Sequence, residues 1–328
     1  MDIILISLTI LGSLAIGWSI GANDAANSLG TAVGSRVVTL KQAILLIAIF
    51  GFLGAFLQGG HVSKTIGKGI VPIDQLDKDA GLYLALIASF AACAWVVIAT
   101  YWKIPISTSH SIVGAVAGAG LALGTTIKWK VLFDIFVCWI ATPFGAAILG
   151  YIFYRSMQNI FYRIVPRRYL RVTFATLIIA SGCYVAYTWG ANDVANSIGL
   201  VVGAGIFSPN VAIILGGIAI VIGITTWGYK VIETVGSEIT HLLPIMAFSA
   251  QLASAINIHV YTMFGIPVST SHSIVGAIFG VGLVKGMHVL NGRIARDMAL
   301  CWVATPFISG LISFSVFKLV MIFVKIGG

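Results

Sequence analysis

The sequence predicts an all-α polytopic membrane protein: two repeats of about five segments each, with broken or re-entrant helices, and roughly 10–12 membrane segments in all. Composition is the first observation behind this prediction. Hydrophobic residues make up 59% of the 328 residues and charged residues 9%, whereas a soluble domain carries about 25% charged residues. So few charges cannot cover a surface that faces water, which excludes a soluble enzyme and makes the lipid bilayer the natural solvent.

Internal duplication is the second observation. Three motifs occur twice in the same order, which indicates a duplicated chain. The pairs are GANDAANSLGTAVG at 21–34 with GANDVANSIGLVVG at 190–203, IPISTSHSIVGA at 104–115 with IPVSTSHSIVGA at 266–277, and CWIATPF at 138–144 with CWVATPF at 301–307. We therefore predict a first transmembrane repeat over 1–160 and a second over 172–328, joined by a basic linker over 161–171.

Apolar runs mark the segments of each repeat in chain order. In the first repeat they lie near residues 3–20, 41–60, 80–102, 104–124 and 131–153. In the second repeat they lie near residues 172–189, 210–229, 241–264, 266–286 and 299–323. Most of these runs are long enough to cross a bilayer.

Two segments of each repeat depart from a simple span. The first runs directly into a polar Asn/Asp motif. The fourth, 104–124 or 266–286, is short, begins with Pro and Ser/Thr, and is rich in glycine. Interrupted segments at matching places of two halves point to the binding site of a transporter. The sequence leaves open whether the fourth segment spans or re-enters, and the repeats are inverted if each crosses the membrane an odd number of times.

Five arginines lie in the predicted linker or just before it, and no Asp or Glu occurs between Asp134 and Asp193. They are Arg155, Arg163, Arg167, Arg168 and Arg171. Because loops rich in Lys and Arg stay on the cytoplasmic side of a membrane, we expect a multi-pass protein with a cytoplasmic central loop. The basic residues form no stripe interleaved with aromatic side chains, which excludes nucleic acid as a partner.

The Ser-Thr-Ser triplets are candidate anion ligands. Ser107, Thr108 and Ser109 recur as Ser269, Thr270 and Ser271, each triplet two residues after a proline, Pro105 or Pro267. Proline suits the start of a helix, and consecutive hydroxyls cannot share one helix face, so the triplets resemble helix caps. A helix N-terminus attracts anions, and two such ends can converge on one anion. Alternatively, the hydroxyls only satisfy interrupted backbone in the membrane.

Asp24 and Asp193 are candidate cation ligands. Each lies in an apolar region without a nearby Lys or Arg, and an intramembrane carboxylate is costly. Amide oxygens accompany them, from Asn23, Asn27, Asn192 and Asn196. Oxygen ligands suit a hard ion such as Na⁺. A protonated Asp that carries H⁺ and an Asp that only caps a broken helix are the alternatives. His110 and His272 follow the triplets as packing residues or proton carriers, and their role stays open.

With these motifs, the chain resembles the inorganic phosphate transporter (PiT) family. The resemblance rests on GANDAANS at 21–28, GANDVANS at 190–197 and P-x-S-T-S-H-S at 105–111 and 267–273. It implies an inverted-repeat core in the cell membrane that carries inorganic phosphate together with Na⁺ or H⁺. It also implies that Asp24, Asn27, Asp193 and Asn196 help form the ion sites and that the triplets contribute to the phosphate site. Gln251 stands where vertebrate-type relatives carry Glu, which removes a candidate proton acceptor and favours Na⁺.

We therefore expect a secondary transporter that moves phosphate with sodium ions by alternating access, at a midplane site between the repeats. A proton-coupled phosphate or metal–phosphate symporter is the alternative. An anion channel is the alternative from a different functional class. An intramembrane serine hydrolase is disfavoured because the G-x-S-x-G elbow is missing, so we expect no enzyme, no cofactor and no resident metal. A homodimer in the bilayer stays open.

Overall fold

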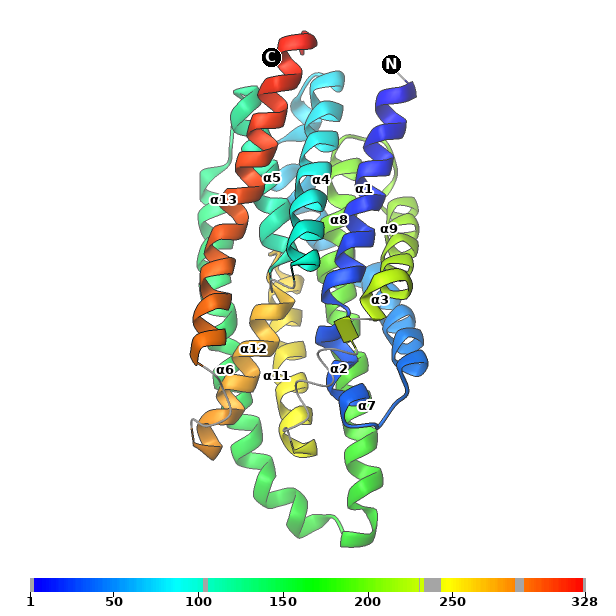
Figure 1. Ribbon diagram of the computed structural model, residues 1–328, viewed down its shortest axis with the longest axis vertical. Coiled ribbons are helices and arrows are strands. Elements are labelled where there is room, and N and C mark those ends of the chain that lie inside the picture. Colours follow the sequence, from blue (N-terminus) through cyan, green and yellow to red (C-terminus); the bar gives the residue numbers. More distant parts are fainter. Residues whose placement is uncertain (1–2, 103–105, 230, 233–242, 287–291, 327–328) are drawn as a thin grey trace.

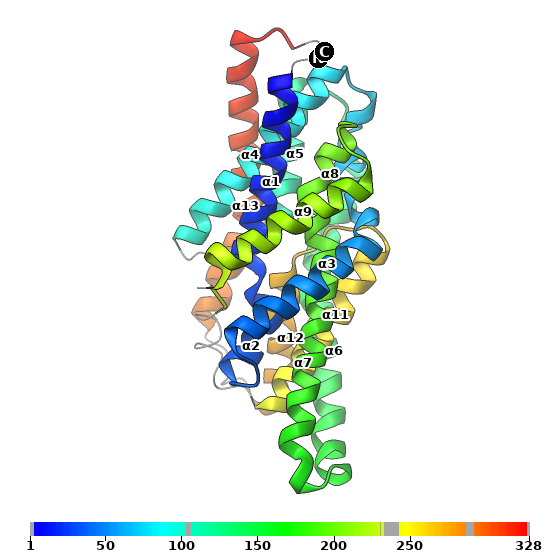
Figure 2. The same cartoon turned by 90° about the vertical axis from the view of Figure 1, so that its right-hand side faces the viewer.

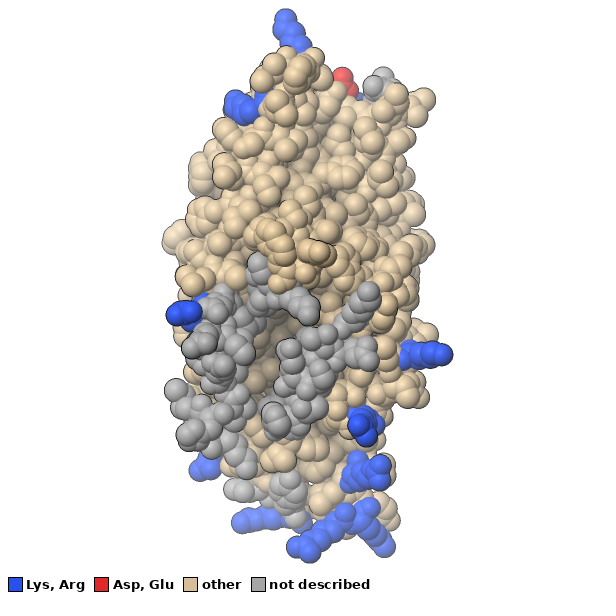
Figure 3. Space-filling view, in the orientation of Figure 1, with Lys and Arg blue, Asp and Glu red and all other residues tan. Residues whose placement is uncertain are grey.

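The computed structural model describes residues 3–102, 106–229, 231–232, 243–286 and 292–326, and every regular element within these ranges is a helix (Figure 1). Seven helical segments there are long and apolar enough to cross a membrane. Large apolar side chains such as Phe144 and Phe307 are 66% and 70% exposed, as expected where lipid is the solvent. On the face shown in Figure 3, most of the described surface carries no charged side chain, and several Lys and Arg side chains gather towards the lower end. The predicted membrane protein is confirmed.

Each repeat contains the five predicted segments. The first repeat contains α1 (Ile3–Asp24), α2 (Ala26–Gly34), α3 (Leu40–Lys64), α4 (Lys78–Tyr101), α5 (Thr108–Leu123) and α6 (Trp129–Ile164). The second contains α7 (Leu170–Trp189), α8 (Ala195–Gly203), α9 (Pro209–Gly223), α11 (Pro244–Met263), α12 (Thr270–Lys285) and α13 (Gly292–Phe323). The first segment of each repeat is broken into two helices, α1 with α2 and α7 with α8, at the Asn/Asp motif.

Local sequence explains several helix boundaries. Thr39 begins α3 with a capping box, in which its side chain accepts from the Gln42 N–H and the Gln42 side chain accepts from the Thr39 N–H, so two otherwise unpaired donors are satisfied. Gly124 ends α5 in the left-handed region, at φ 77°, which glycine adopts without steric cost. The second repeat breaks with a π-turn, η4 (Gly190–Val194), and such turns are frequent at functional sites.

The two repeats are inverted and interlocked. In Figure 1, α1 descends from the upper end and α7 ascends from the lower end, while Figure 2 shows α3 and α9 crossing the bundle obliquely. Across the repeats, α5 packs against α13 and α12 against α6, as α1 does against α9 and α3 against α7. Each of these contacts between the repeats therefore occurs twice, with the roles of the two repeats exchanged. Neither repeat encloses its core alone.

Glycine makes the closest of these contacts. A Cβ atom on Gly114 of α5 would lie 2.2 Å from the Pro306 carbonyl oxygen of α13, and one on Gly276 of α12 would lie 2.2 Å from the Pro143 carbonyl oxygen of α6. Neither distance leaves room for a side chain. The carbonyls belong to the CW(I/V)ATPF motifs, so the third repeated motif supplies the surface on which each short helix rests.

The short helices are the returning arms of hairpins. α5 packs back along α4, and α12 along α11. The two hairpins enter from opposite ends (Figure 1), and their tips meet, since the Ser109 hydroxyl donates to the Val268 carbonyl at 2.9 Å. The question left open by the sequence is thus answered: the fourth segments re-enter.

The basic connection between the repeats is shorter than its predicted range. α6 continues to Ile164, a short 3₁₀ turn covers Arg167–Tyr169, and α7 begins at Leu170. All five arginines are exposed on this projecting hairpin. They have no acidic neighbour along the chain, so their charge faces solvent or headgroups.

Candidate functional site

The first hydroxyl of each triplet is a helix cap. The Ser107 hydroxyl accepts from the His110 N–H at 3.3 Å, and the Ser269 hydroxyl accepts from the His272 N–H at 3.2 Å. The expectation that proline opens these helices is wrong for Pro267, because α12 begins at Thr270 behind its Ser269 cap; Pro105 lies outside the described residues. The caps hold the next two hydroxyls of each triplet at the hairpin tips.

These next hydroxyls reach the two acidic residues, in part across the repeats. The Thr108 hydroxyl donates to Asp24 Oδ2 at 2.7 Å, and the Ser271 hydroxyl of the other repeat donates to Asp24 Oδ1 at 3.3 Å. The Ser109 hydroxyl in turn donates to Asp193 Oδ1 at 3.2 Å. Thr270 approaches the Asp193 carboxylate from its own repeat. One cluster therefore contains both carboxylates and both hairpin tips.

Two asparagines complete the cluster at equivalent places. The Asn27 amide donates to the Ser271 hydroxyl at 2.9 Å and to Asp24 at 3.4 Å. Its counterpart Asn196 donates to Ser109 at 2.9 Å and to Asp193 at 2.9 Å. Each Asn therefore lies between the carboxylate of its own repeat and a serine of the other.

The other two asparagines are not equivalent. Asn192 donates to Asp193 Oδ1 at 3.0 Å and to the Val268 carbonyl at 2.7 Å, whereas Asn23 donates to the Thr100 hydroxyl of α4 at 2.7 Å. The structure therefore brings Asn192 into the cluster but directs the Asn23 side chain away from it.

The cluster is buried and retains free oxygen atoms. Asp24 is 2% exposed and Asp193 is 1% exposed. Among the described residues, the buried oxygens Asp193 Oδ2 and Asn196 Oδ1 have no hydrogen-bond donor. An unpaired buried oxygen is costly, and carboxylate and amide oxygens together are ligands for a hard cation. These oxygen ligands thus fit a cation such as Na⁺.

Four aromatic rings support the hairpin tips. His110 stacks on Trp139 and His272 on Trp302, each with 3.7 Å between ring centroids, and the two imidazoles contact each other at 4.6 Å. His110 Nδ1 pairs with the Trp302 carbonyl at 3.0 Å, an arrangement in which the nitrogen is the donor. Both imidazoles therefore pack between the hairpin tips and α6 and α13. The sequence analysis assigned no role to Trp139 or Trp302, although their recurrence in the two CW(I/V)ATPF motifs could have indicated one.

Gln251 of α11 lies near the cluster and is fully hydrogen-bonded. Its amide donates to the Ser28 carbonyl at 3.1 Å and to the Thr31 hydroxyl at 2.5 Å, and its carbonyl accepts from the Ser181 hydroxyl at 2.7 Å. Gln251 thus connects α11 to α7 and to α2. Its contact in α2 is at Ser28, the residue that directly follows Asn27. Sequence reasoning noted this residue as a departure from relatives but could not foresee this bridging role.

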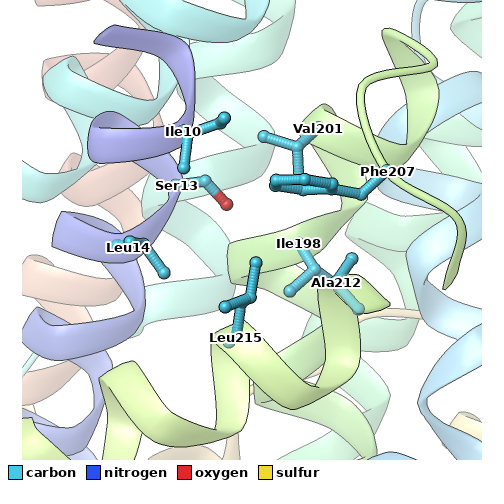
Figure 4. Close-up of a pocket in the computed structure, with 9 residues that line it drawn as sticks. Ile10, Ser13, Leu14, Ile198, Val201, Phe207, Ala212 and Leu215 are labelled. Carbon is cyan, nitrogen blue, oxygen red and sulfur yellow. The ribbon is translucent and has the colours of Figure 1, made fainter. Parts of the chain in front are cut away.

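A separate hollow near the first helix is too small to compete as a site. Figure 4 shows it between α1, α8 and α9, where Ser13 is surrounded by apolar side chains such as Ile198 and Phe207. Its volume is about 10 Å³, which is close to the minimum for a single water molecule.

Comparisons with known proteins identify a family for this chain. A sequence profile of the phosphate transporter family matches residues 20–172 and again 163–313. The chain is 33% identical to a "Putative phosphate permease" of Pyrococcus abyssi, over 96% of this chain and 98% of the relative. It is 28% identical to the chloroplastic inorganic phosphate transporter 2-1 of Arabidopsis thaliana, over 90% of this chain and 69% of that protein.

A solved structure titled "The sodium-dependent phosphate transporter" superposes with a TM-score of 0.89 at 28% identity. The match covers 98% of this chain and all of the other chain. The profile matches both repeats, and the structural match extends over both hairpins and both broken helices. This chain belongs to the phosphate transporter family.

Proposed function

We propose that the protein is a secondary transporter that moves inorganic phosphate together with Na⁺ by alternating access. The observation that carries this proposal is the single buried cluster in which hydroxyls of both hairpin tips meet both carboxylates. Hydroxyls and helix N-termini are ligands for an oxyanion, and carboxylate and amide oxygens are ligands for a cation.

Phosphate is proposed to bind between the hairpin tips. Thr108, Ser109, Thr270 and Ser271 are its proposed side-chain donors, and the first turns of α5 and α12 add free backbone N–H groups. Ser107 and Ser269 hold these turns as caps. Two opposed helix N-termini favour an anion at the point where they meet.

Sodium ions are proposed to bind beside the carboxylates. Asp24 with Asn27 and Asp193 with Asn196 are the proposed ligand pairs. Two ionised carboxylates and one phosphate carry three or four negative charges, while two helix ends supply only about one positive charge. Two monovalent cations bring the site near neutrality, which makes cation and anion binding depend on each other.

Alternating access is proposed because the site lies between inverted repeats. Transporters of this construction expose a fixed central site to either side by moving one set of helices against the other. The hairpins and broken helices are shared between the repeats, so a relative movement opens one face while closing the opposite one. We place the protein in the cell membrane with the arginine-rich connection in the cytoplasm, with repeats over 1–160 and 172–328 on either side of it.

Phosphate uptake into proteoliposomes tests the proposal. The sodium gradient and the pH gradient are imposed separately, with the same internal buffer. Accumulation above equilibrium with a sodium gradient alone is the expected result. Accumulation with a pH gradient alone would replace Na⁺ by H⁺, and uptake that only equilibrates, with or without single-channel currents, would contradict coupled transport.

A further inference from the structure

A stripe of polar side chains runs along α2 from the buried cluster to the end of the helix. Asn27, Thr31 and Ser35 form this α2 stripe; they are four residues apart and therefore share one helix face. Asn27 and Thr31 are partly exposed, and Ser35 is exposed. The distance along the helix from Asn27 to Ser35 is about 12 Å, so the α2 stripe connects the cluster with the surface.

The α2 stripe faces the second hairpin. The Asn27 amide donates to the Ser271 hydroxyl of α12 at 2.9 Å, and the Gln251 amide of α11 donates to the Thr31 hydroxyl at 2.5 Å. The Thr31 hydroxyl has no acceptor for its own proton among the residues that the structure describes, so this proton is available to a ligand. Polar side chains that face the interior of a membrane protein mark the routes of its substrates and ions.

The equivalent face of the second repeat is apolar beyond its asparagine and is closed. Thr31 corresponds to Leu200, and Ser35 corresponds to Ala204. Asn196 and Leu200 are fully buried, so this face of α8 gives water no comparable route to the cluster. In Figure 1, α2 continues the descent of α1 towards the arginine-rich connection, and α8 continues the ascent of α7 towards the opposite end. The α2 stripe therefore leads from the cluster towards the arginine-rich end.

Arg36 follows the α2 stripe in a backbone conformation that favours glycine. Its φ is 57°, and its counterpart after α8 is Gly205, with a φ of 70°. A residue with a Cβ atom is disfavoured in this left-handed region. Arg36 is exposed and forms no ion pair with any acidic residue in the described part of the chain. An unpaired arginine in an unfavourable conformation indicates that its charge serves a purpose other than folding.

We propose that phosphate passes between the cluster and the arginine-rich end of the molecule along the α2 stripe, with Arg36 as an accessory oxyanion site at its mouth. This inference rests on the phosphate transport proposed above. A guanidinium group binds phosphate oxygens through two parallel hydrogen bonds, and its charge raises the local concentration of anions. Thr31 then offers its hydroxyl proton on the way to the cluster.

A phospholipid headgroup offers the same phosphate chemistry as the free ion. The α2 stripe favours the free ion, because a headgroup anchored in the bilayer has no use for polar side chains that continue inwards to Asn27. The experiments below separate the two sources.

Cysteine labelling of the full-length protein in everted and right-side-out membrane vesicles tests the route. Thr31→Cys is treated with an anionic methanethiosulfonate, and the unsubstituted protein corrects for native cysteines. Arg167→Cys reports the face on which the arginine-rich connection lies. We expect Thr31→Cys to react from that same face and inorganic phosphate to slow the reaction. Leu200→Cys, the equivalent change in the other repeat, should not react from that face.

Arg36→Gly in the Thr31→Cys protein tests the mouth. It should slow labelling by the anionic reagent about two- to fivefold, the effect of one exposed charge, and leave labelling by a neutral methanethiosulfonate unchanged. The difference should vanish at high salt, which screens exposed charges. Arg167→Gln, which removes the same charge elsewhere, should have no effect. The melting temperature of Arg36→Gly should not fall, because glycine suits this backbone conformation.

Several outcomes would overturn the inference. Labelling of Thr31→Cys from the face opposite to Arg167→Cys, or labelling that phosphate does not slow, would exclude the route. Equal slowing of the anionic and neutral reagents would exclude the role of Arg36. If anionic phospholipid stabilises the unsubstituted protein but not Arg36→Gly, with equal labelling rates, Arg36 binds a headgroup instead. Labelling does not depend on a sodium gradient, so a failure of sodium-driven uptake would contradict the proposed function separately.

Discussion

Replacing Gly276 by Ala tests whether the contact between α12 and α6 positions the phosphate donors. The added Cβ would lie 2.2 Å from the Pro143 carbonyl oxygen and 2.7 Å from Pro143 Cα, so α12 has to move by about 1.2 Å to restore an ordinary contact of about 3.4 Å. Overpacking of this kind costs about 1–3 kcal/mol. The movement also displaces Ser271, a proposed phosphate donor near the start of α12 whose hydroxyl lies 3.3 Å from Asp24, by more than a hydrogen bond to bound phosphate tolerates.

The assay is phosphate uptake into proteoliposomes with a sodium gradient, together with thermal unfolding of the purified variant. Losing a hydrogen bond to a charged group costs about 1.5–3 kcal/mol, so we expect the KM for phosphate to rise by about tenfold or more. Gly60→Ala is the matched control, because a Cβ at Gly60 meets nothing within 4 Å. A Gly276→Ala protein with the KM and melting temperature of the Gly60→Ala protein would refute the reasoning.

Three further predictions concern the cluster itself. Asp24→Asn and Asp193→Asn should each abolish sodium-driven phosphate uptake, since each removes a proposed sodium ligand; unchanged sodium dependence in both variants would contradict the assignment. Thr108→Ala should raise the KM for phosphate about tenfold because it removes a donor, while Ser7→Ala on the exposed face of α1 should not; equal losses would show a non-specific effect. Gln251→Leu should lower the melting temperature, because it leaves buried polar partners unpaired at about 1–3 kcal/mol each; an unchanged melting curve would show that this bridge contributes nothing.

Much of the fold followed from patterns along the chain. Low charge predicted the membrane, repetition predicted two repeats, and the polar breaks at 21–28 and 190–197 correctly marked the broken helices. Boundaries that depend on capping were less accurate, since a proline two residues before a triplet predicts a helix start equally well at Pro267 or at Thr270. The hydrogen bond to the Ser269 hydroxyl favours the later start.

The site was predicted as a set of residue types that share one location between the repeats, with the hydroxyls assigned to the anion and Asp24 and Asp193 to the cation. The pairwise contacts could not be predicted. The hairpin tips bring Ser109 of one repeat to Asp193 of the other. Residues 84 positions apart meet through helix packing that no local pattern describes.

The sequence by itself determined that the chain is a duplicated membrane protein and which polar side chains its interior has to accommodate, because composition and repetition are properties of the chain alone. The tertiary structure decided how equal motifs differ. Thr100 and Thr262 are equivalent residues of the two repeats, yet Asn23 donates to Thr100 while Asn192 pairs with Val268. Both partners are encoded in both repeats, so the choice depends on how each hairpin packs against its broken helix.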